Sequence, residues 1–400
     1  MTAQAQPIST PTTENDNEND EFQTGQVLTI VGGHFVHDTF SAFISPLLPL
    51  IIEKLSLSLT SAGFVWSVIQ IPALFTPFVG HLADRLSLRY FVILAPAVTA
   101  TLMSLLGLAP NYLILALILF VSGISVAAFH APAPVMVARI SGPRVGKGMS
   151  FFMAGGELGR TAGPLLAVWA VSMWGLEGSY RVMVLGWAAS LILYWRLRSI
   201  PARPDKQQNL RQMLPALRRL FVPLFGITLT RELMLTGLAA FLPTFMSLGG
   251  ASLWMAGASL SIWELAGVGG ALLSGTISDR LGRRGVLFAA MLNSSLLLFL
   301  FLNVSGWLLI LVLLGLGFAS LSITPVLLAL VQEQMPNSRA LANGLFISMA
   351  FAVRPVVAYI FGQLGDRYDL STAYFVAASV SLLALPIIFF LPEGHEPIID

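Results

Sequence analysis

Residues 80–90 read Gly-His-Leu-Ala-Asp-Arg-Leu-Ser-Leu-Arg-Tyr, and residues 275–285 read Gly-Thr-Ile-Ser-Asp-Arg-Leu-Gly-Arg-Arg-Gly. The two stretches begin 195 residues apart in a chain of 400 residues, and each lies between two long apolar runs. The matching positions are Gly80 with Gly275, Asp84 with Asp279, Arg85 with Arg280, and Arg89 with Arg284. A charged turn that returns after half the chain predicts two related halves.

The composition restricts the class of protein. Hydrophobic residues make up 56% of the chain and charged residues only 10%, whereas soluble proteins carry about 25% charged residues. A helical protein that crosses a membrane many times is the common class with this composition. A net charge of +2 gives no reason to expect a nucleic-acid partner. The chain has no cysteine, which excludes disulfides and cysteine-based metal sites.

Twelve apolar runs are long enough to cross a bilayer, which needs about 20 residues. They divide the chain into an all-α membrane protein with two pseudo-symmetric bundles of six helices each. The predicted parts are a disordered cytoplasmic tail (1–25), the N-terminal bundle (26–198), a cytoplasmic linker (199–215), the C-terminal bundle (216–391) and a second cytoplasmic tail (392–400).

Lysine and arginine residues predict the orientation, because they gather in the cytoplasmic loops of membrane proteins. With both termini in the cytoplasm, sixteen of these residues fall in cytoplasmic segments and three, Lys54, Arg181 and Arg367, fall outside. We therefore expect a multi-pass protein of the cell (inner or plasma) membrane with both termini in the cytoplasm.

Ionisable residues inside the apolar runs are the candidate functional residues, since charges in a bilayer are costly and are found mostly where they serve a function. They are His34, Asp38, His130, Glu157, Arg160, Arg231, Glu232, Glu264 and Arg354. We expect them to line a cavity for substrate and protons.

Two pairs of these residues lie at helical spacing. His34 and Asp38 are four residues apart on one helix face, which suits either a proton site or a structural contact between helices. Glu157 and Arg160 are three residues apart and can pair within one helix, which favours a structural role slightly.

The other candidates have no such local pairing. Arg231 and Glu232 are adjacent, so their side chains point about 100° apart and should serve different neighbours. Glu264 is a plausible partner for one of the arginines. Arg354 has no acidic residue three or four positions away and is the best candidate for contact with an anionic substrate. No second ligand lies at a metal-site spacing from His130, and we expect neither a metal site nor a cofactor.

Glycines recur every four residues along one predicted helix, at Gly155, Gly159 and Gly163, and Pro164 follows. Such a stripe lets a neighbouring helix approach closely. Residues 159–164 also resemble the antiporter motif of drug–proton exchangers, although the closing glycine pair of that motif is absent. Close packing alone is the more favoured interpretation.

The repeated turn resembles the Gly-x-x-x-Asp-Arg-x-Gly-Arg-Arg loop of major facilitator superfamily transporters. The second copy keeps this pattern in full, and the first departs from it at Ser87 and Leu88. The resemblance implies two bundles that rock about a site at the middle of the membrane. It also implies that Gly80, Asp84, Arg85 and Arg89, with Gly275, Asp279, Arg280 and Arg284, act as a conformational latch on the cytoplasmic side.

Further motifs resemble the fosmidomycin resistance protein branch of this superfamily. They include Gly-His-Phe at 33–35, Ala-Phe-His at 128–130, Gly-Pro-Leu-Leu at 163–166 and Asn-Gly-Leu-Phe at 343–346. The branch usually has Pro-Glu after Phe-His, where this chain has Ala131 and Pro132. It also usually has uncharged residues at the positions of Glu157 and Arg160.

The resemblance implies a secondary active transporter, with proton-coupled efflux of a small molecule or drug, anionic molecules among the candidates. A proton-linked importer of organic anions or sugars and a lipid flippase are the alternatives. An intramembrane enzyme is the least favoured, because no catalytic motif lies on a helix.

The expected partners are the lipid bilayer, a small-molecule substrate and protons, and we expect a monomer. Within this scheme we hypothesise that Asp38 carries the coupled proton and that Arg354 helps to bind an anionic group.

Overall fold

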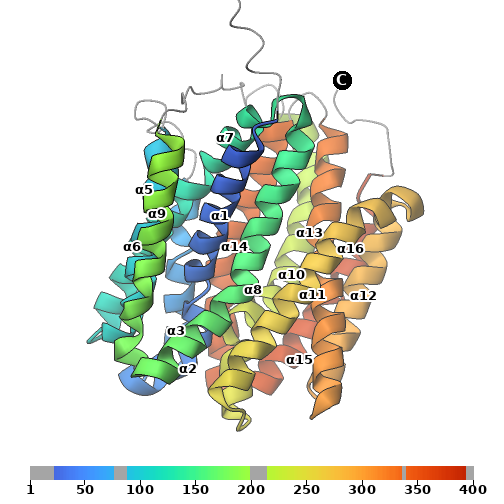
Figure 1. Ribbon diagram of the computed structural model, residues 1–400. Helices are drawn as coiled ribbons and strands as arrows, with labels where there is room; N and C mark the ends of the chain where they lie inside the picture. Colours follow the sequence, from blue (N-terminus) through green and yellow to red (C-terminus); the bar gives the residue numbers. More distant parts are fainter. Residues whose placement is uncertain (1–21, 76–87, 199–213, 336–338, 393–400) are drawn as a thin grey trace, which may run out of the picture.

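The computed structural model describes residues 22–75, 88–198, 214–335 and 339–392 (Figure 1). All the regular elements within these ranges are helices, as the composition predicts. A helix satisfies its own backbone hydrogen bonds, which lipid cannot do. Most of both predicted tails, most of the central linker and, in the first copy of the repeated turn, Gly80, Asp84 and Arg85 lie outside the described residues.

The first part of the chain, residues 24–198, is called the N-terminal half here. Its helices are α1 (Thr24–Ser41), α2 (Ile44–Leu55), α3 (Leu59–Val68), α5 (Leu88–Ser104), α6 (Tyr112–His130), α7 (Ala133–Ile140), α8 (Val145–Gly178) and α9 (Met183–Leu197). Four short 3₁₀ helices lie between them, at Ile71–Phe75, Leu106–Leu108, Gly142–Arg144 and Ser179–Val182. The first predicted run is therefore two helices, α1 and α2, with a break at residues 42–43.

Residues 214–392 are called the C-terminal half. Its helices are α10 (Leu214–Leu248), α11 (Leu253–Leu281), α12 (Arg283–Phe301), α13 (Trp307–Gln334), α14 (Arg339–Arg367), α15 (Leu370–Ser381) and α16 (Ala384–Ile388). The last predicted run, like the first, is divided into two helices, α15 and α16.

Nine helical segments in the described residues are long and apolar enough to cross a membrane. The other three predicted spans correspond to α3, α8 and α9, which are not among the nine. The described part of the α3 span is short, α9 has 15 residues, and α8 carries Glu157 and Arg160 in its interior. The protein is thus an all-helical, multi-pass membrane protein, and the count of twelve spans stays a prediction.

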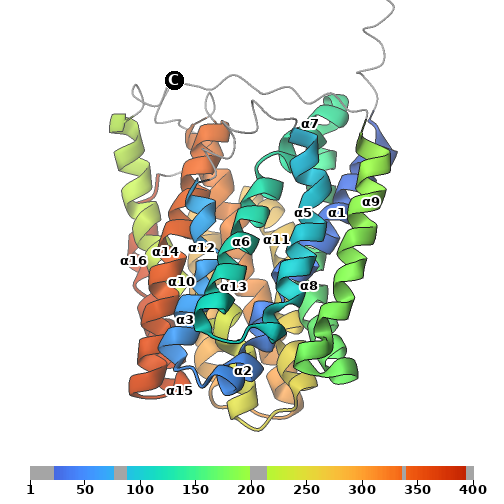
Figure 2. The ribbon, with the colours of Figure 1, turned by 90° about the vertical axis from the view of Figure 1, so that its left-hand side faces the viewer.

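Polar residues fix the start of four helices at one end of the molecule. The side chains of Ser58, Asn111, Ser252 and Asp369 each accept a hydrogen bond from the backbone N–H three residues later. Such a cap stabilises a helix by about 1 kcal/mol because it satisfies a backbone donor that has no partner within the helix. These helices begin at the end where α2 lies, which we call the α2 end; the opposite end is the α7 end (Figures 1 and 2).

The apolar cores show how the two halves meet. One large core includes Phe43 and Trp66 of the N-terminal half together with Phe241 and Phe361 of the C-terminal half. Two smaller cores each belong to one half, one around Phe129 and Phe152 and the other around Leu224, Met291 and Ile323. The helices that supply the shared core meet at the α2 end, and the separate cores lie towards the α7 end (Figures 1 and 2). Among the described residues, the apolar core shared by the two halves therefore lies at the α2 end.

Two glycines allow this close packing at the α2 end. A Cβ atom on Gly63 of α3 would lie 2.3 Å from the backbone oxygen of Ala358 in α14. A Cβ atom on Gly362 of α14 would lie 2.4 Å from the backbone oxygen of Leu59 in α3. Only glycine permits both contacts without moving the two helices apart.

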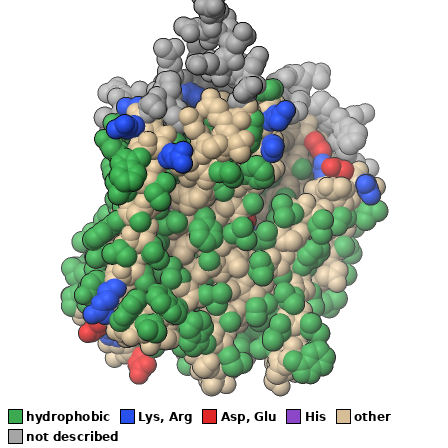
Figure 3. Space-filling view, in the orientation of Figure 1, with side chains coloured by type: hydrophobic (Ala, Val, Ile, Leu, Met, Phe, Trp, Pro, Cys, Tyr) green, Lys and Arg blue, Asp and Glu red, His purple; other side chains and the backbone are tan. Residues whose placement is uncertain are grey.

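The surface agrees with a membrane environment. On the face shown in Figure 3, charged side chains gather towards the two ends, and hydrophobic side chains cover much of the area between them. Large apolar side chains such as Leu113, Trp195 and Leu272 are exposed. In water such a surface would favour aggregation, whereas lipid tails cover it without cost.

Candidate functional site

The first charged group lies where α8 of the N-terminal half meets α11 of the C-terminal half. Arg160 pairs with Glu157 of its own helix, and its Nε atom lies 3.6 Å from Oε2 of Glu264. The Arg160 side chain is 40% exposed although it lies near the middle of a 34-residue helix. One arginine thus lies between two carboxylates, one from each half, and faces open space.

The second charged group lies within the C-terminal half. Glu232 of α10 is buried, and its Oε2 atom accepts a hydrogen bond from Nε of Arg354 in α14 at 3.1 Å. Its Oε1 atom lies 4.0 Å from Nη1 of Arg231, and Nη2 of Arg231 donates a hydrogen bond to the hydroxyl of Thr324 in α13. Arg354 also lies over the ring of Phe351, and its side chain is 33% exposed. Here one carboxylate lies between two arginines.

The two groups have opposite charge imbalances. With all side chains ionised, Glu157, Arg160 and Glu264 sum to −1, and Arg231, Glu232 and Arg354 sum to +1. An unbalanced charge inside a bilayer costs several kcal/mol, on the order of 3 kcal/mol for a single side chain at a helix centre. The first group is therefore suited to binding a proton, and the second is suited to binding an anion.

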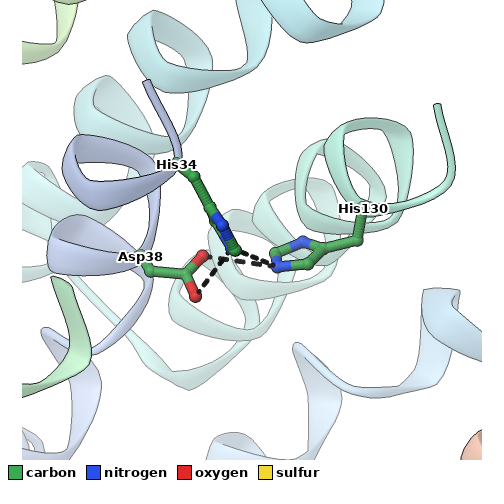
Figure 4. A group of neighbouring side chains, drawn as sticks. All are labelled: His34, Asp38 and His130. Carbon is green, nitrogen blue, oxygen red and sulfur yellow. Dashed lines mark hydrogen bonds and ion pairs between the residues drawn. The ribbon is translucent and has the colours of Figure 1, made fainter. Parts of the chain in front are cut away.

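A third group lies wholly in the N-terminal half (Figure 4). His34 and Asp38 come from α1, and His130 is the last residue of α6. Nε2 of His34 lies 3.3 Å from Oδ2 of Asp38, and Nε2 of His130 lies 3.4 Å from Oδ1 of Asp38. The two Nε2 atoms are 3.2 Å apart. His34 and Asp38 are buried, whereas the His130 side chain is partly exposed.

The glycine stripe of α8 lies against α1 beside this third group. Cβ atoms on Gly159 and Gly163 would each lie 2.4 Å from a backbone oxygen of α1, and one on Gly155 would lie 2.9 Å from another. The stripe therefore permits close contact between α8 and α1. Pro164 lies inside α8, and its backbone oxygen is 3.4 Å from where a Cβ of Gly257 in α11 would be.

Sequence reasoning missed the contact that joins the halves at the α2 end. Asp366 of α14 accepts hydrogen bonds from the backbone N–H groups of Leu59 and Thr60, at 2.7 and 2.8 Å, and from the Thr60 hydroxyl. It thus caps the start of α3, where a negative charge is favoured by the helix dipole. The Gly-Asp-Arg sequence at residues 365–367 resembles part of the repeated turn. It is the feature of the sequence that could have indicated the Asp366 contact.

The second copy of the repeated turn is described at the α7 end. Asp279 pairs with Arg283, which also pairs with Glu333 of α13 at 2.6 Å. Arg284 donates to the backbone oxygen of Leu391. Gly275 and Arg280 lie in the last two turns of α11, and Arg89 of the first copy is the second residue of α5. The latch role of all eight predicted residues stays a prediction.

The predicted site residues thus fall into three groups and not one. Glu157 pairs with Arg160 at the expected spacing, Arg231 and Glu232 reach different helices, and Glu264 lies beside an arginine. Arg354, which has no local partner in the sequence, pairs with a carboxylate 122 positions away. His130 joins His34 and Asp38, which no chain spacing indicated.

Two pockets lie between the halves at the α2 end. One, of about 450 Å³, is lined by Thr60, Gln363, Asp366 and Arg367, among others. The second, of about 370 Å³, is lined by residues of α2 and α10 that include Pro49 and Thr244. Neither pocket contains a member of the three charged groups.

An ion pair between two packed halves of an all-helical membrane protein suits a transporter. A model of the Major Facilitator Superfamily matches residues 30–357 and residues 225–398. The chain belongs to the Major Facilitator Superfamily, as its repeated turn indicated. It is therefore a membrane transporter and not an enzyme.

Individual relatives agree with this assignment. The chain is 24% identical to the fosmidomycin resistance protein of Escherichia coli (strain K12), over 99% of both chains. Its fold is shared with a D-xylose–proton symporter, with a TM-score of 0.76, 18% identity and coverage of 94% of this chain and 100% of that chain. A bacterial homologue of the human lysosomal transporter Spinster in an inward-facing conformation gives a TM-score of 0.78 at 14% identity, covering 92% and 96%.

Proposed function

We propose that this protein is a proton-coupled exporter of a small anionic molecule that works by alternating access in the cell membrane. The observation that carries the proposal is the position of Arg160 between a carboxylate of its own half and Glu264 of the other half. The similarity to a fosmidomycin resistance protein supports export. The antiport direction, the coupling and the monomeric state belong to the proposal.

The coupled proton is assigned to the group of Glu157, Arg160 and Glu264. A carboxylate that couples proton movement to a conformational change must meet different partners in the two states. The two partners of Asp38, His34 and His130, both lie in its own half and would move with it. The contact between Arg160 and Glu264 crosses the halves and changes when they rock. We therefore prefer Glu264 to Asp38, the residue that the sequence favoured.

The proton would follow the movement of the halves. Arg160 can form an ion pair with Glu264 only when the carboxylate is ionised. In the described state, with the halves packed at the α2 end, the pair is formed, so the proton has been released. When the halves rock and Glu264 leaves Arg160, the carboxylate takes up a proton from the other side. If the α2 end faces outward, this cycle brings protons into the cell.

The anionic group of the substrate is assigned to Arg354 and Arg231. Their group carries a net charge of +1, and the Arg354 side chain has one third of its area exposed. Only its Nε atom is bonded to Glu232, which leaves guanidinium donors for a carboxylate or phosphonate. Binding an anion there would remove the charge imbalance of the group.

A reconstituted system tests the proposal. In proteoliposomes with an internal pH-sensitive dye, we expect substrate-dependent proton flux with anionic substrates from a panel of phosphonates, lipophilic cations and sugars. Arg354→Lys keeps the charge but loses the planar fork, so its affinity for the anionic substrate should fall about tenfold, with neutral molecules little affected. Proton flux driven only by lipophilic cations, or unaltered affinity in a folded Arg354→Lys protein, would contradict the anion assignment.

The orientation has its own test. The chain has no native cysteine, so single cysteines report cleanly on exposure. Ser305→Cys and Asn111→Cys, both at the α2 end, should react with an impermeant maleimide on intact cells. Asn209→Cys, in the predicted linker outside the described residues, should react only after the membrane is opened. Labelling of the cysteine at 209 from outside would reverse the orientation and, with it, the proposed direction of transport.

A further inference from the structure

We propose that His34, Asp38 and His130 form a binding site for a divalent transition-metal ion, and that zinc fits this site best. This inference goes beyond the proposed function and does not depend on it. The three side chains each offer one ligand atom, and these atoms lie within 4.8 Å of one another. They point towards one another from α1 and α6 (Figure 4).

Hydrogen bonding defines which ring nitrogens face the centre of the group. Nδ1 of His34 lies 2.8 Å from the backbone oxygen of Phe152, and Nδ1 of His130 lies 3.0 Å from that of Val126. A carbonyl oxygen can only accept, so both Nδ1 atoms carry a hydrogen. A neutral imidazole has one N–H, and both Nε2 atoms therefore present lone pairs.

Three acceptors consequently meet in a buried place. The lone pairs of the two Nε2 atoms, 3.2 Å apart, face each other and the carboxylate of Asp38. Without a positive charge between them, these groups repel one another. A shared proton or a metal ion can supply that charge, and the convergence of three ligand atoms from three side chains favours the metal.

The separation of the two histidine nitrogens is close to the edge of a tetrahedral site. Zinc binds histidine nitrogen and carboxylate oxygen at about 2.0–2.1 Å in tetrahedral geometry, which sets neighbouring ligands about 3.3–3.4 Å apart. The two Nε2 atoms are 3.2 Å apart, and the nitrogen–oxygen separations of 3.3 and 3.4 Å end on different oxygens of Asp38, so each carboxylate oxygen faces one histidine. The Nδ1–H bonds to backbone oxygens are the outer contacts that orient metal-binding histidines.

The surroundings leave space for an ion and a path to it. A Cβ on Gly156 would lie 2.6 Å from Nε2 of His34 and 3.0 Å from Oδ2 of Asp38, so glycine keeps this side of the group open. The ring of Phe152 stacks on His34 at 4.0 Å between centroids and shields it. His130, with 38% of its side chain exposed, lies on the accessible side. Three protein ligands leave a fourth position for water.

The position of the three ligands in the fold indicates the role of a bound ion. All three ligands belong to the N-terminal half, so rocking of the halves leaves the site intact. The ion would therefore remain bound through a transport cycle and would not be the transported substrate. It would tie α1 to the end of α6, just before the break that leads into α7.

Metal binding to the purified full-length protein tests the inference. The protein is prepared with an affinity tag that contains no histidine and is titrated with Co²⁺, which replaces zinc and absorbs visible light when four-coordinate. We expect one Co²⁺ per chain with tetrahedral absorption bands, and their loss when Zn²⁺ is added. Asp38→Asn and His130→Gln should each weaken binding by about 100-fold or more, since even outer contacts contribute 10–100-fold.

Two further variants make the test specific. Gly156→Ala places a methyl group against two ligands and should also weaken binding while all three remain present. His37→Gln changes a buried histidine next to Asp38 that is outside the group. The affinity of this variant for Co²⁺ should be within about threefold of that of the unchanged protein.

Absence of tetrahedral bands in the unchanged protein would overturn the proposal and leave a shared proton in its place. Full binding by a folded His130→Gln protein would overturn it as well. Neither result bears on transport driven through Glu264.

Discussion

Glu264→Gln is expected to abolish uphill transport driven by a pH gradient while leaving downhill exchange of the substrate largely intact. Glutamine cannot release a proton and cannot form an ion pair with Arg160, so the conformational change loses its link to the proton. With one proton per substrate, two pH units and no membrane potential, the unchanged protein should build a concentration ratio of about 100. The variant should reach a ratio near one in the same proteoliposomes.

Glu157→Gln is the matched control for this experiment. It removes the other carboxylate beside Arg160, but that carboxylate lies on the same helix and stays with Arg160 in every state. Uphill transport should therefore persist in Glu157→Gln. Asp38→Asn belongs in the same series because the sequence favoured Asp38 as the proton carrier. If the Glu264→Gln protein accumulates substrate and the Asp38→Asn protein does not, the coupled proton returns to Asp38.

The sequence predicted the membrane architecture because that information is local. Apolar runs and basic loops each lie within a short stretch, and most of the predicted spans appear as helices where the runs are. The pair of Glu157 and Arg160 was likewise foreseeable, because three positions along a helix bring two side chains together. The matched turns near residues 85 and 280 indicated the superfamily because each is a short, local stretch of sequence.

The contacts between distant helices could not be predicted in this way. Arg160 and Glu264, Glu232 and Arg354, and His34 and His130 are each about 100 positions apart. In a soluble protein an apolar stripe shows which face of a helix points inward. In a membrane the lipid-facing side is apolar too, so helices such as α11 and α13 carry no such stripe, and their rotation depends on packing. The grouping of His34, Asp38 and His130 was not expected from the sequence because His130 comes from another helix.

Gly362→Ala is expected to prevent closure of the α2 end. Its Cβ would lie 2.4 Å from the backbone oxygen of Leu59 and 2.8 Å from Cα of Thr60, and backbone atoms cannot turn aside as a side chain can. The helices α3 and α14 must then separate. Overpacking of this kind costs about 1–3 kcal/mol, which shifts the balance between the two states by about 5- to 150-fold towards opening at the α2 end.

A cysteine at position 244 can report this opening. Thr244 is buried and lines the pocket between α2 and α10 at the α2 end. In a Gly362→Ala protein, Thr244→Cys should react with maleimide at least about fivefold faster than in the parent, in line with the shift in population. The transport rate should fall as well, because the state packed at the α2 end becomes less populated.

Gly344→Ala is the control, because it makes the same change in the same helix where a Cβ meets nothing within 4 Å. It should leave labelling and transport unaltered.

Asp366→Ala should act in the same direction as Gly362→Ala without a steric clash, because it removes the cap on α3 and about 1–2 kcal/mol of stabilisation with it. If Gly362→Ala and Asp366→Ala both label and transport like Gly344→Ala, the contact between α3 and α14 does not control closure. If only Gly362→Ala opens the end, closure depends on the glycine contact, and the carboxylate contributes little to it.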